Sequence, residues 1–274
     1  MDKKEAWEMF KKTGKIEYYL EYKKQDKKWC FLIEKVEGII LKESLYGDTS
    51  KIIQLFTKEH GLISVLCKGA KSAKSKFRAT TLKFTYGIFD LYYKQDKLST
   101  LASVDVKNSF YNIRKDIILI SYVSFLSDLT LQVIKQNARF DLFDDFISVL
   151  NKIEDKFDPL ILTNILELKY LPYLGVGISL DSCALCGTNK NIITIDGDAG
   201  GYVCQSCYTN EKIVDSKTLK LMRMYYLIDI KSISNIKISD KTKNEINIFI
   251  DKYYERYTGL YLKSKDFLKK MIAY

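Results

Sequence analysis

Two pairs of cysteines constrain this chain more than any other feature of its sequence. Cys183 and Cys186 form one CxxC pair, and Cys204 and Cys207 form a second pair after seventeen residues. Two thiolates separated by two residues can reach one tetrahedral metal ion at about 2.3 Å, and a second pair completes the tetrahedron. Because four sulfurs leave no position for water or substrate, the pattern predicts a structural zinc site in a finger-like segment, residues 181–212.

Two disulfides or redox-active pairs are the alternatives for these cysteines, and they suit secreted or thioredoxin-like chains. The rest of the sequence has neither character. Residues 1–12 read MDKKEAWEMFKK, which lacks the apolar stretch of an export signal. The other two cysteines, Cys30 and Cys67, are isolated and are predicted to be free thiols.

The most apolar stretch, residues 117–131, contains three serines and Asp128. It therefore falls short of the ~20 apolar residues that a membrane span needs. We expect a cytoplasmic protein, associated with the nucleoid, that has no membrane partner.

The chain of 274 residues carries a formal net charge of +10. An excess of this size favours a polyanionic partner, nucleic acid first and an anionic membrane second. Few of the 44 basic residues are arginine, and the chain is rich in Ile, Asn and Tyr, so a codon-biased genome also explains the excess. The position of the charges is therefore more informative than their sum.

The positive charge is densest in residues 68–78, KGAKSAKSKFR, which contain no acidic residue. Such a stretch cannot bury itself and is predicted to be a solvated, mobile loop. Its basic side chains could follow the phosphates of a single strand while its aromatic ring stacks on a base. A soluble hairpin tip is the alternative. The candidate DNA-binding residues are Lys68, Lys71, Lys74, Lys76, Phe77 and Arg78.

A small β-domain is predicted around this loop, at residues 33–109. Five strands in a short stretch suit a Greek-key barrel, of which the OB-fold is a common nucleic-acid-binding form, although an SH3-like barrel would look similar. The predicted strands are rich in β-branched and aromatic residues and are separated by turn signals. They cover residues 36–41, 50–56, 62–66, 82–93 and 98–106.

Apolar residues then recur at intervals of three or four, which predicts helices. One stripe runs from Ile117 to Leu131 and another from Phe140 to Leu150, and Asp158-Pro159 begins a helix that ends near Leu171. These stripes are typical of a core, although a groove between such helices could accept an acidic-aromatic peptide.

Two further helices are predicted after the cysteines. Ser216 is expected to cap a helix that ends near Asp229, and Ser239 or Asp240 to cap one that ends near Tyr257. Residues 259–265 suit either a solvated tail or an ordered cap. The predicted fold is thus α+β, an OB-fold barrel followed by a helical domain, residues 110–180, an inserted four-cysteine zinc finger, and C-terminal helices, residues 213–274, that pack with the helical domain.

Catalytic motifs are missing from the sequence. His60 is the only histidine, it lies in a predicted turn, and we expect a structural role for it. There is no GxxxxGK[ST], HExxH or GxSxG motif. The acidic pairs Asp144-Asp145 and Glu154-Asp155 have no neighbouring histidine and are predicted to be solvated. These observations disfavour an enzyme.

Several stretches resemble the RecO family of bacterial recombination mediators. Residues 38–78, GIILKESLYGDTSKIIQLFTKEHGLISVLCKGAKSAKSKFR, are similar to its N-terminal barrel. Residues 171–187, LPYLGVGISLDSCALCG, and 199–207, AGGYVCQSC, resemble its two cysteine pairs, and residues 259–268, GLYLKSKDFL, resemble its C-terminal signature. The resemblance covers about residues 33–270.

Two features depart from the family pattern. The chain has Leu82-Lys83-Phe84 where the family often has Leu-x-Pro-Phe, so the entry to the fourth strand is expected to differ. Residues 1–32 form a predicted N-terminal extension. Within it, WEMFKKTGKIEYYLEYK resembles a short free-standing bacterial protein of unknown role.

The resemblance implies a non-enzymatic protein that binds single- and double-stranded DNA and anneals complementary strands. With RecR, and in some settings RecF, it would help RecA replace the single-strand binding protein SSB, whose acidic C-terminal tail the family engages. Two other classes stay open on the residues alone. They are a zinc-ribbon transcription or RNA-binding factor and a zinc-containing nuclease or nucleotidyl transferase.

Overall fold

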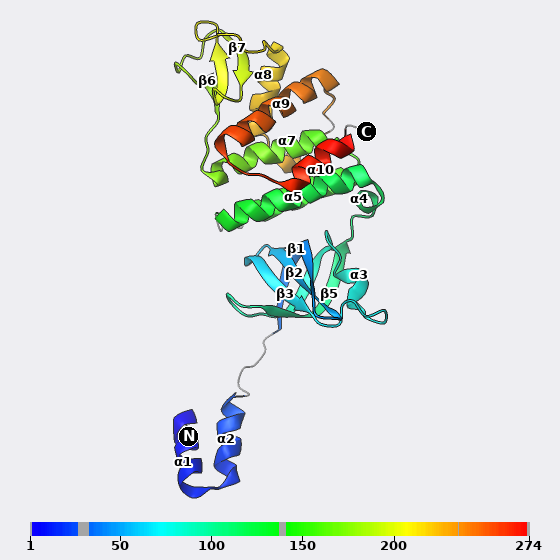
Figure 1. Cartoon of the computed structure of the whole chain (residues 1–274), viewed down its shortest axis with the longest axis vertical. Coiled ribbons are helices and arrows are strands. Elements are labelled where there is room, and N and C mark those ends of the chain that lie inside the picture. The colour runs from blue at the N-terminus through cyan, green and yellow to red at the C-terminus, as the bar shows by residue number, and fades with distance from the viewer. Residues whose placement is uncertain (1, 27–32, 137–140, 235, 273–274) are drawn as a thin grey trace.

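The structure, a computed structural model, describes residues 2–26, 33–136, 141–234 and 236–272. It contains a helical hairpin, a five-stranded barrel, and a helical body that carries a small three-stranded sheet (Figure 1). The predicted α+β class is therefore confirmed. Cys30 and Phe140, which the sequence analysis considered, lie outside the described residues.

The barrel is closed in the order β1-β2-β3-β5-β4. All neighbouring strands are antiparallel except β3 and β5, which pair in parallel through Val65 and Leu66. A closed five-stranded barrel of this kind is OB-like, as expected. The strands are β1 Ile33–Tyr46, β2 Ser50–Thr57, β3 Gly61–Cys67, β4 Tyr86–Tyr92 and β5 Ser99–Asn108.

The fourth strand begins at Tyr86, four residues later than predicted. Phe84 has a φ angle of 71°, which is incompatible with an extended strand. Its N–H donates to Ile40 O at 2.8 Å, and Ile40 N–H donates to Thr85 O at 3.1 Å. The turn before β4 is thus bonded across to β1, although residues 82–85 alternate apolar and polar in sequence as a strand would.

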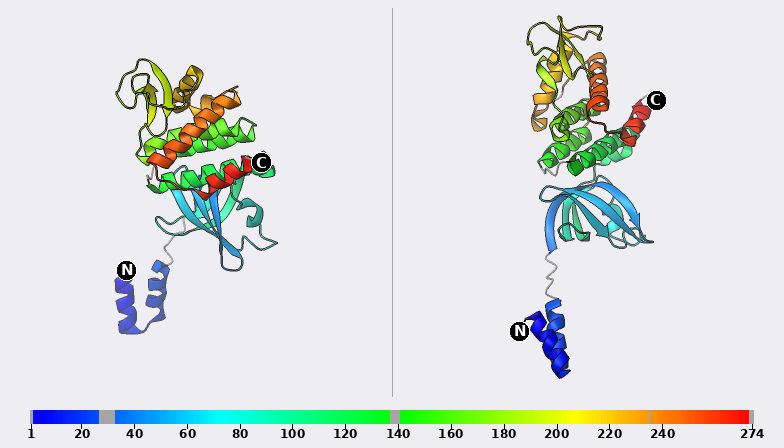
Figure 2. Two further views of the ribbon diagram at one scale, coloured as in Figure 1. Left: turned by 45° about the horizontal axis from the view of Figure 1, so that its top comes forward. Right: turned by 60° about the vertical axis from the view of Figure 1, so that its left-hand side comes forward.

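The helical body packs on one end of the barrel, as the views in Figures 1 and 2 show. Its elements are α4 Tyr111–Lys115, α5 Ile117–Gln136, α6 Leu142–Glu154, α7 Pro159–Tyr170, η1 Leu171–Leu174, α8 Ser216–Leu227, η2 Ile230–Ser232, α9 Asp240–Tyr257 and α10 Lys263–Ile272.

The helix caps agree with the sequence in two of three cases. Asp158 caps α7 and Ser239 caps α9, each through its side-chain oxygen. The cap of α8 is Asp215 rather than Ser216, because the Asp215 carboxylate accepts the Lys217 N–H at 2.8 Å. The terminal stretch is ordered, and its helix α10 packs along α5.

Helix α5 is long and apolar enough to cross a membrane by length and composition alone. In this structure 61% of its most apolar stretch is buried inside the protein. The serines on it do not interrupt the helix, since the hydroxyl of Ser127 donates to the carbonyl of Val123 at 2.7 Å. The helix is therefore placed as the core helix of the body.

The N-terminal segment forms a hairpin of two helices, α1 Lys3–Thr13 and α2 Ile16–Asp26. Asp2 and Glu5 make a capping box at the start of α1, and Gly14 ends it with a φ of 66°. The sequence predicts one short helix that is interrupted at this glycine. A second helix follows instead, and the rings of Trp7 and Tyr22 pack at a centroid distance of 4.8 Å.

One hydrophobic core runs from the end of the barrel into the helices. Ile39, Leu41 and Phe56 of the barrel belong to the same buried cluster as the apolar faces of α5, α6 and α7. The Phe56 ring lies 5.2 Å from the ring of Phe143 and 6.4 Å from that of Phe146. A separate cluster, including Ile40, fills the barrel interior.

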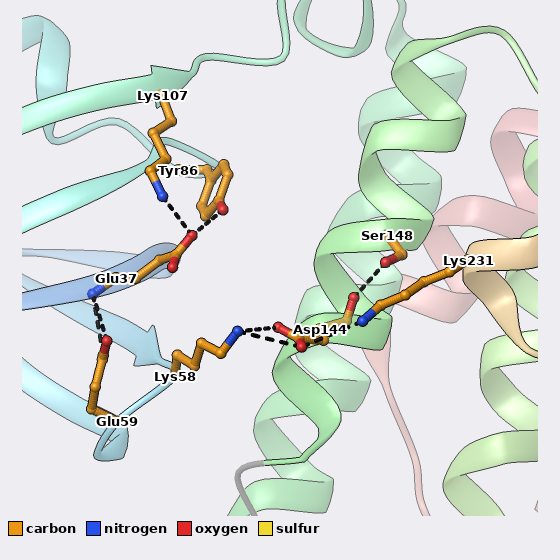
Figure 3. A network of polar contacts seen from close by, with 8 residues as sticks. All are labelled: Glu37, Lys58, Glu59, Tyr86, Lys107, Asp144, Ser148 and Lys231. Carbon is orange, nitrogen blue, oxygen red and sulfur yellow. Dashed lines mark hydrogen bonds and ion pairs between the residues drawn. The ribbon is translucent and has the colours of Figure 1, made fainter.

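A polar network flanks this core at the same junction (Figure 3). Lys58, after β2, donates to the Asp144 carboxylate of α6 at 3.0 Å, and Lys231 donates to it at 3.5 Å. The hydrogen bond and charge of Lys58 lower the pKa of Asp144. Asp144 is solvated as expected, since its side chain is 42% exposed, but it is also paired with lysines from parts of the chain distant in sequence.

Glu37 on β1 accepts hydrogen bonds from Lys107 at 2.8 Å and from the hydroxyl of Tyr86, and these bonds lower its pKa. Glu154 is also not a free surface residue. Its two carboxylate oxygens accept the N–H groups of Asn112 and Ile113 at 2.9 and 3.0 Å, which satisfies the start of α4.

The shared core predicts a large effect of truncation at Phe56. We expect Phe56→Ala to lower the free energy of unfolding by about 3–5 kcal/mol, because it opens a cavity between barrel and helices. Urea unfolding measures this change. Leu45→Ala is the control, since Leu45 on the adjoining strand is 74% exposed. Equal effects of the two substitutions would contradict a common core.

Candidate metal centre and nucleic-acid interface

The four cysteines lie on a small sheet inserted between η1 and α8. Its strands are β6 Ser179–Cys183, β7 Ile192–Asp196 and β8 Gly201–Cys204, in the order β6-β8-β7. Cys183 and Cys204 end neighbouring strands, and each is followed by a turn that contains the second cysteine of its pair. The sheet thus brings the two CxxC turns to the same edge.

The sulfur atoms are spaced as a single metal ion requires. All four Sγ atoms lie within 4.8 Å of one another, and Cys186 and Cys204 are 3.7 Å apart. Four sulfurs at about 2.3 Å from a tetrahedral ion stand about 3.8 Å apart. The Cys204 N–H points to Cys183 Sγ at 3.4 Å, as expected for a thiolate acceptor. The residues therefore fit a closed four-sulfur metal site.

The thiols differ in their pKa values. Burial raises the pKa of Cys183, but backbone N–H donors from Cys204, Cys186 and Leu185 lower it to about 6. Hydrogen bonds with Cys186 and Cys204 raise the pKa of Cys207 to about 12. The divergence follows from the hydrogen bonds between neighbouring thiols, because each such bond favours the thiolate of one partner over that of the other.

The sheet is fixed to the helical body by tyrosines. The Tyr202 hydroxyl donates to Leu219 O of α8 at 2.5 Å, and the Tyr257 hydroxyl of α9 donates to Asp198 O at 2.7 Å. Gly201 lets β6 and β8 approach, because a Cβ there would lie 2.1 Å from Ser179 O. Gly201, at the start of β8, therefore serves the close packing of the two strands.

The basic loop, residues 68–78, is anchored at its base. Ala70 is fully buried in the barrel cluster, and Lys71 N–H donates to Thr49 O at 2.8 Å. Turns and a single helical turn, α3 Phe77–Thr80, continue to the next strand. The loop thus has more structure than the sequence suggests, because Ala70 is buried in the barrel and Lys71 is bonded to Thr49.

The structure leaves the five basic side chains of this loop exposed. Among the described residues none of them has a carboxylate partner within 4.0 Å. Phe77 differs, since its ring is half-buried against the barrel cluster and the Lys76 ammonium lies 5.2 Å from its centre. The cations are therefore available to an anion, whereas one part of the aromatic ring is already covered.

An open groove lies beside the loop, which we call the loop groove. Its volume is about 520 Å³, and Leu45, Lys71, Arg78 and Leu82 line it. Leu45 is 74% exposed. The sequence analysis missed Leu45, although its place at the strand end before the Gly47 turn was a possible signal. The lining also includes Glu43, whose carboxylate pairs with the Lys51 ammonium at 2.8 Å. Exposed apolar side chains beside the unpaired Lys71 and Arg78 suit bases and phosphates.

His60 has the structural role that its sequence context predicts. Its Nε2 lies 2.5 Å from Glu34 Oε1, and its ring stacks on Tyr93 at a centroid distance of 4.3 Å. These contacts join the turn between β2 and β3 to β1 and to the end of β4.

Fold and sites together define a class: an OB-like barrel with an exposed basic loop, joined to a helical body that carries a four-cysteine cluster. Residues 32–110 match the family described as Recombination protein O N terminal, and residues 114–266 match Recombination protein O C terminal. The chain belongs to the RecO family of DNA repair proteins.

Curated relatives agree with this assignment. The chain is 32% identical over 243 residues to DNA repair protein RecO of Listeria monocytogenes, covering 87% of this chain and 95% of the relative. It is 33% identical over 244 residues to the same-named protein of Bacillus velezensis, and 32% identical to that of Bacillus subtilis, each covering 88% of this chain and 95% of the relative. The predicted family is therefore confirmed.

Proposed function

We propose that this chain is a recombination mediator that binds single- and double-stranded DNA and anneals complementary strands. The observation that carries the proposal is the exposed, unpaired basic loop on an OB-like barrel in a member of the RecO family. In this proposal it acts in the cytoplasm with RecR and RecF, binds the acidic tail of SSB, and promotes the loading of RecA on SSB-coated DNA. It has no enzymatic activity of its own.

The proposal assigns a separate task to each part of the chain. The barrel, residues 33–109, binds DNA. The helical residues 110–180 and 213–274 form one body, and residues 181–212 form a zinc finger that closes its far side. The boundary between the barrel and the helical body agrees with the two family matches, which meet between residues 110 and 114.

An annealing assay tests the function as a whole. We expect the protein to accelerate pairing of complementary single strands, to retain this activity when the strands carry SSB, and to leave their lengths unchanged. Fluorescence quenching follows pairing, and a denaturing gel follows cleavage. Metal-dependent shortening of the strands would instead identify a nuclease, and the absence of annealing in folded protein would exclude the mediator.

The loop accounts for a defined part of DNA binding. If Lys68, Lys71, Lys74, Lys76 and Arg78 each touch a phosphate of one strand, they contribute about −3.5 to the salt slope of binding, at about −0.7 per contact. Changing all five to Ser should remove that contribution, as measured by anisotropy with a labelled oligonucleotide at several salt concentrations. An unchanged slope in a folded variant would place the DNA elsewhere.

We infer that the metal is zinc, because a closed tetrahedral set of four thiolates in two CxxC pairs is typical of structural zinc sites. When bound, zinc supplies a structural cross-link and no chemistry at an open position. Cys183, Cys186, Cys204 and Cys207 would hold it, and metal binding then contributes to the folding free energy of the small sheet.

Cys186→Ser tests this site. We expect about one zinc per chain in the wild type and loss of the metal in the variant, measured by elemental analysis of the reduced protein. Cys67→Ala is the matched control, since Cys67 is a buried free thiol inside the barrel. Wild-type protein that contains no metal after purification without chelators would contradict the site.

A further inference from the structure

Two more grooves lie on the barrel next to the loop groove. The junction groove, about 360 Å³, lies where the barrel meets α5 and the start of α10. The turn groove, about 590 Å³, lies between the outer face of β2 and β3 and the turn that joins β4 to β5. Figure 1 shows α5 next to the end of the barrel and α10 along α5.

The three grooves adjoin one another at shared lining residues. Ser44 lines both the loop groove and the junction groove, and Gln54 lines both the junction groove and the turn groove. A single extended ligand can therefore run from the basic loop, past the helical body, to the turn between β4 and β5. We call this path the track.

The strand register explains why a polar path crosses the sheet here. Lys42 pairs with Gln54 on β2, and Gln54 pairs with Ser64 on β3, so the three residues stand in one row. The Gln54 amide donates to the Ser64 hydroxyl at 2.9 Å. A bulge between Ile40 and Lys42 buries Leu41 and leaves Lys42 exposed, which re-aims the side chains of β1 at this point.

The charge of the track suits a polyanion. Its two new grooves add Lys42, Lys135, Lys263, Lys94 and Lys97 to the cations of the loop. Among the residues that the structure places, none of these five lysines has a carboxylate within 4.0 Å, in contrast to the paired Lys58, Lys107 and Lys231 of Figure 3. Asp96 and Asp128 are the carboxylates in the two linings.

An exposed aromatic ring stands in the junction groove. Tyr261 is 75% exposed, and its hydroxyl donates to Asp266 at 2.6 Å. That bond fixes the hydroxyl end of the side chain and leaves the face of the ring exposed to a ligand. Bases of every kind stack on such a ring, so it suits a single strand better than a duplex, whose bases are already stacked.

We propose that one single strand of DNA follows the track from the basic loop through the junction groove to the turn groove, and that the helical body contributes Lys135, Lys263 and Tyr261 to binding. This proposal rests on the proposed function and extends it, because it makes the helical body part of the DNA site. The barrel alone then holds only part of the strand.

The test compares two triple variants of the full chain. Lys42→Gln, Lys135→Gln and Lys263→Gln together remove three contacts on the track. Lys217→Gln, Lys220→Gln and Lys241→Gln remove the same charge from exposed sites on α8 and α9 that line none of the three grooves. Binding of labelled oligo(dT) is measured from low to high salt.

We expect the track variant to flatten the salt slope by about 2, at about 0.7 per lost contact, and the control variant to keep the wild-type slope. Tyr261→Leu should weaken binding about tenfold and leave the slope unchanged, because stacking releases no counterions. The affinity of both proteins for oligo(dT) should rise with oligonucleotide length and then stop rising. We expect the wild type to reach its maximum affinity at a greater length than the track variant.

The outcomes separate this proposal from the function on which it rests. Wild-type protein that binds no oligonucleotide would refute DNA binding itself. A second outcome is that the loop variant binds oligo(dT) more weakly, whereas the track variant and the control variant bind it equally well. This result would refute the track but would leave the proposed function intact. A track variant that binds oligo(dT) normally but fails only on duplex DNA would assign the junction groove to double strands and also overturn the proposal.

Discussion

The contact between Phe56 and the phenylalanines of α6 is the constraint on which the rest of the structure depends. A closed barrel of this size has room inside for only a small cluster of side chains, so much of its apolar surface must be covered from outside. The helices supply that cover, and in return the barrel end completes their core. Barrel and helices therefore share one hydrophobic core at this interface, although two separate family models match them.

The polar contacts at the junction fix the orientation of the barrel on the helical body. Apolar burial is non-directional and would tolerate several orientations of the barrel. Lys58 and Lys231 share Asp144, and Glu37 is held by two donors from other strands, so these groups are satisfied together in the observed arrangement (Figure 3). Exposed ion pairs contribute only about 0.2–1 kcal/mol each, so their role is orientation more than stability.

Much of the fold could be predicted because its signals are local. The cysteine spacing, the β-branched strands and the caps at Asp158 and Ser239 each depend on a few adjacent residues. The failures are equally specific. Phe84 fits the apolar and polar alternation of a strand, yet its positive φ angle keeps it out of β4, which begins at Tyr86. The pairing of Asp144 and Glu154 was not predicted because their partners are 86 and 42 residues away in sequence.

The sequence by itself determined the class of fold, the two cysteine pairs that come together and the family, since short-range spacing and composition carry that information. Only the tertiary structure decided which side chains face one another. It covered part of Phe77, exposed Leu45 and Tyr261, and brought Lys42 of the barrel into one groove with Lys135 and Lys263 of the helices. Such neighbours are set by strand register and by the docking of helices on the barrel end, and neither leaves a periodic signal along the chain.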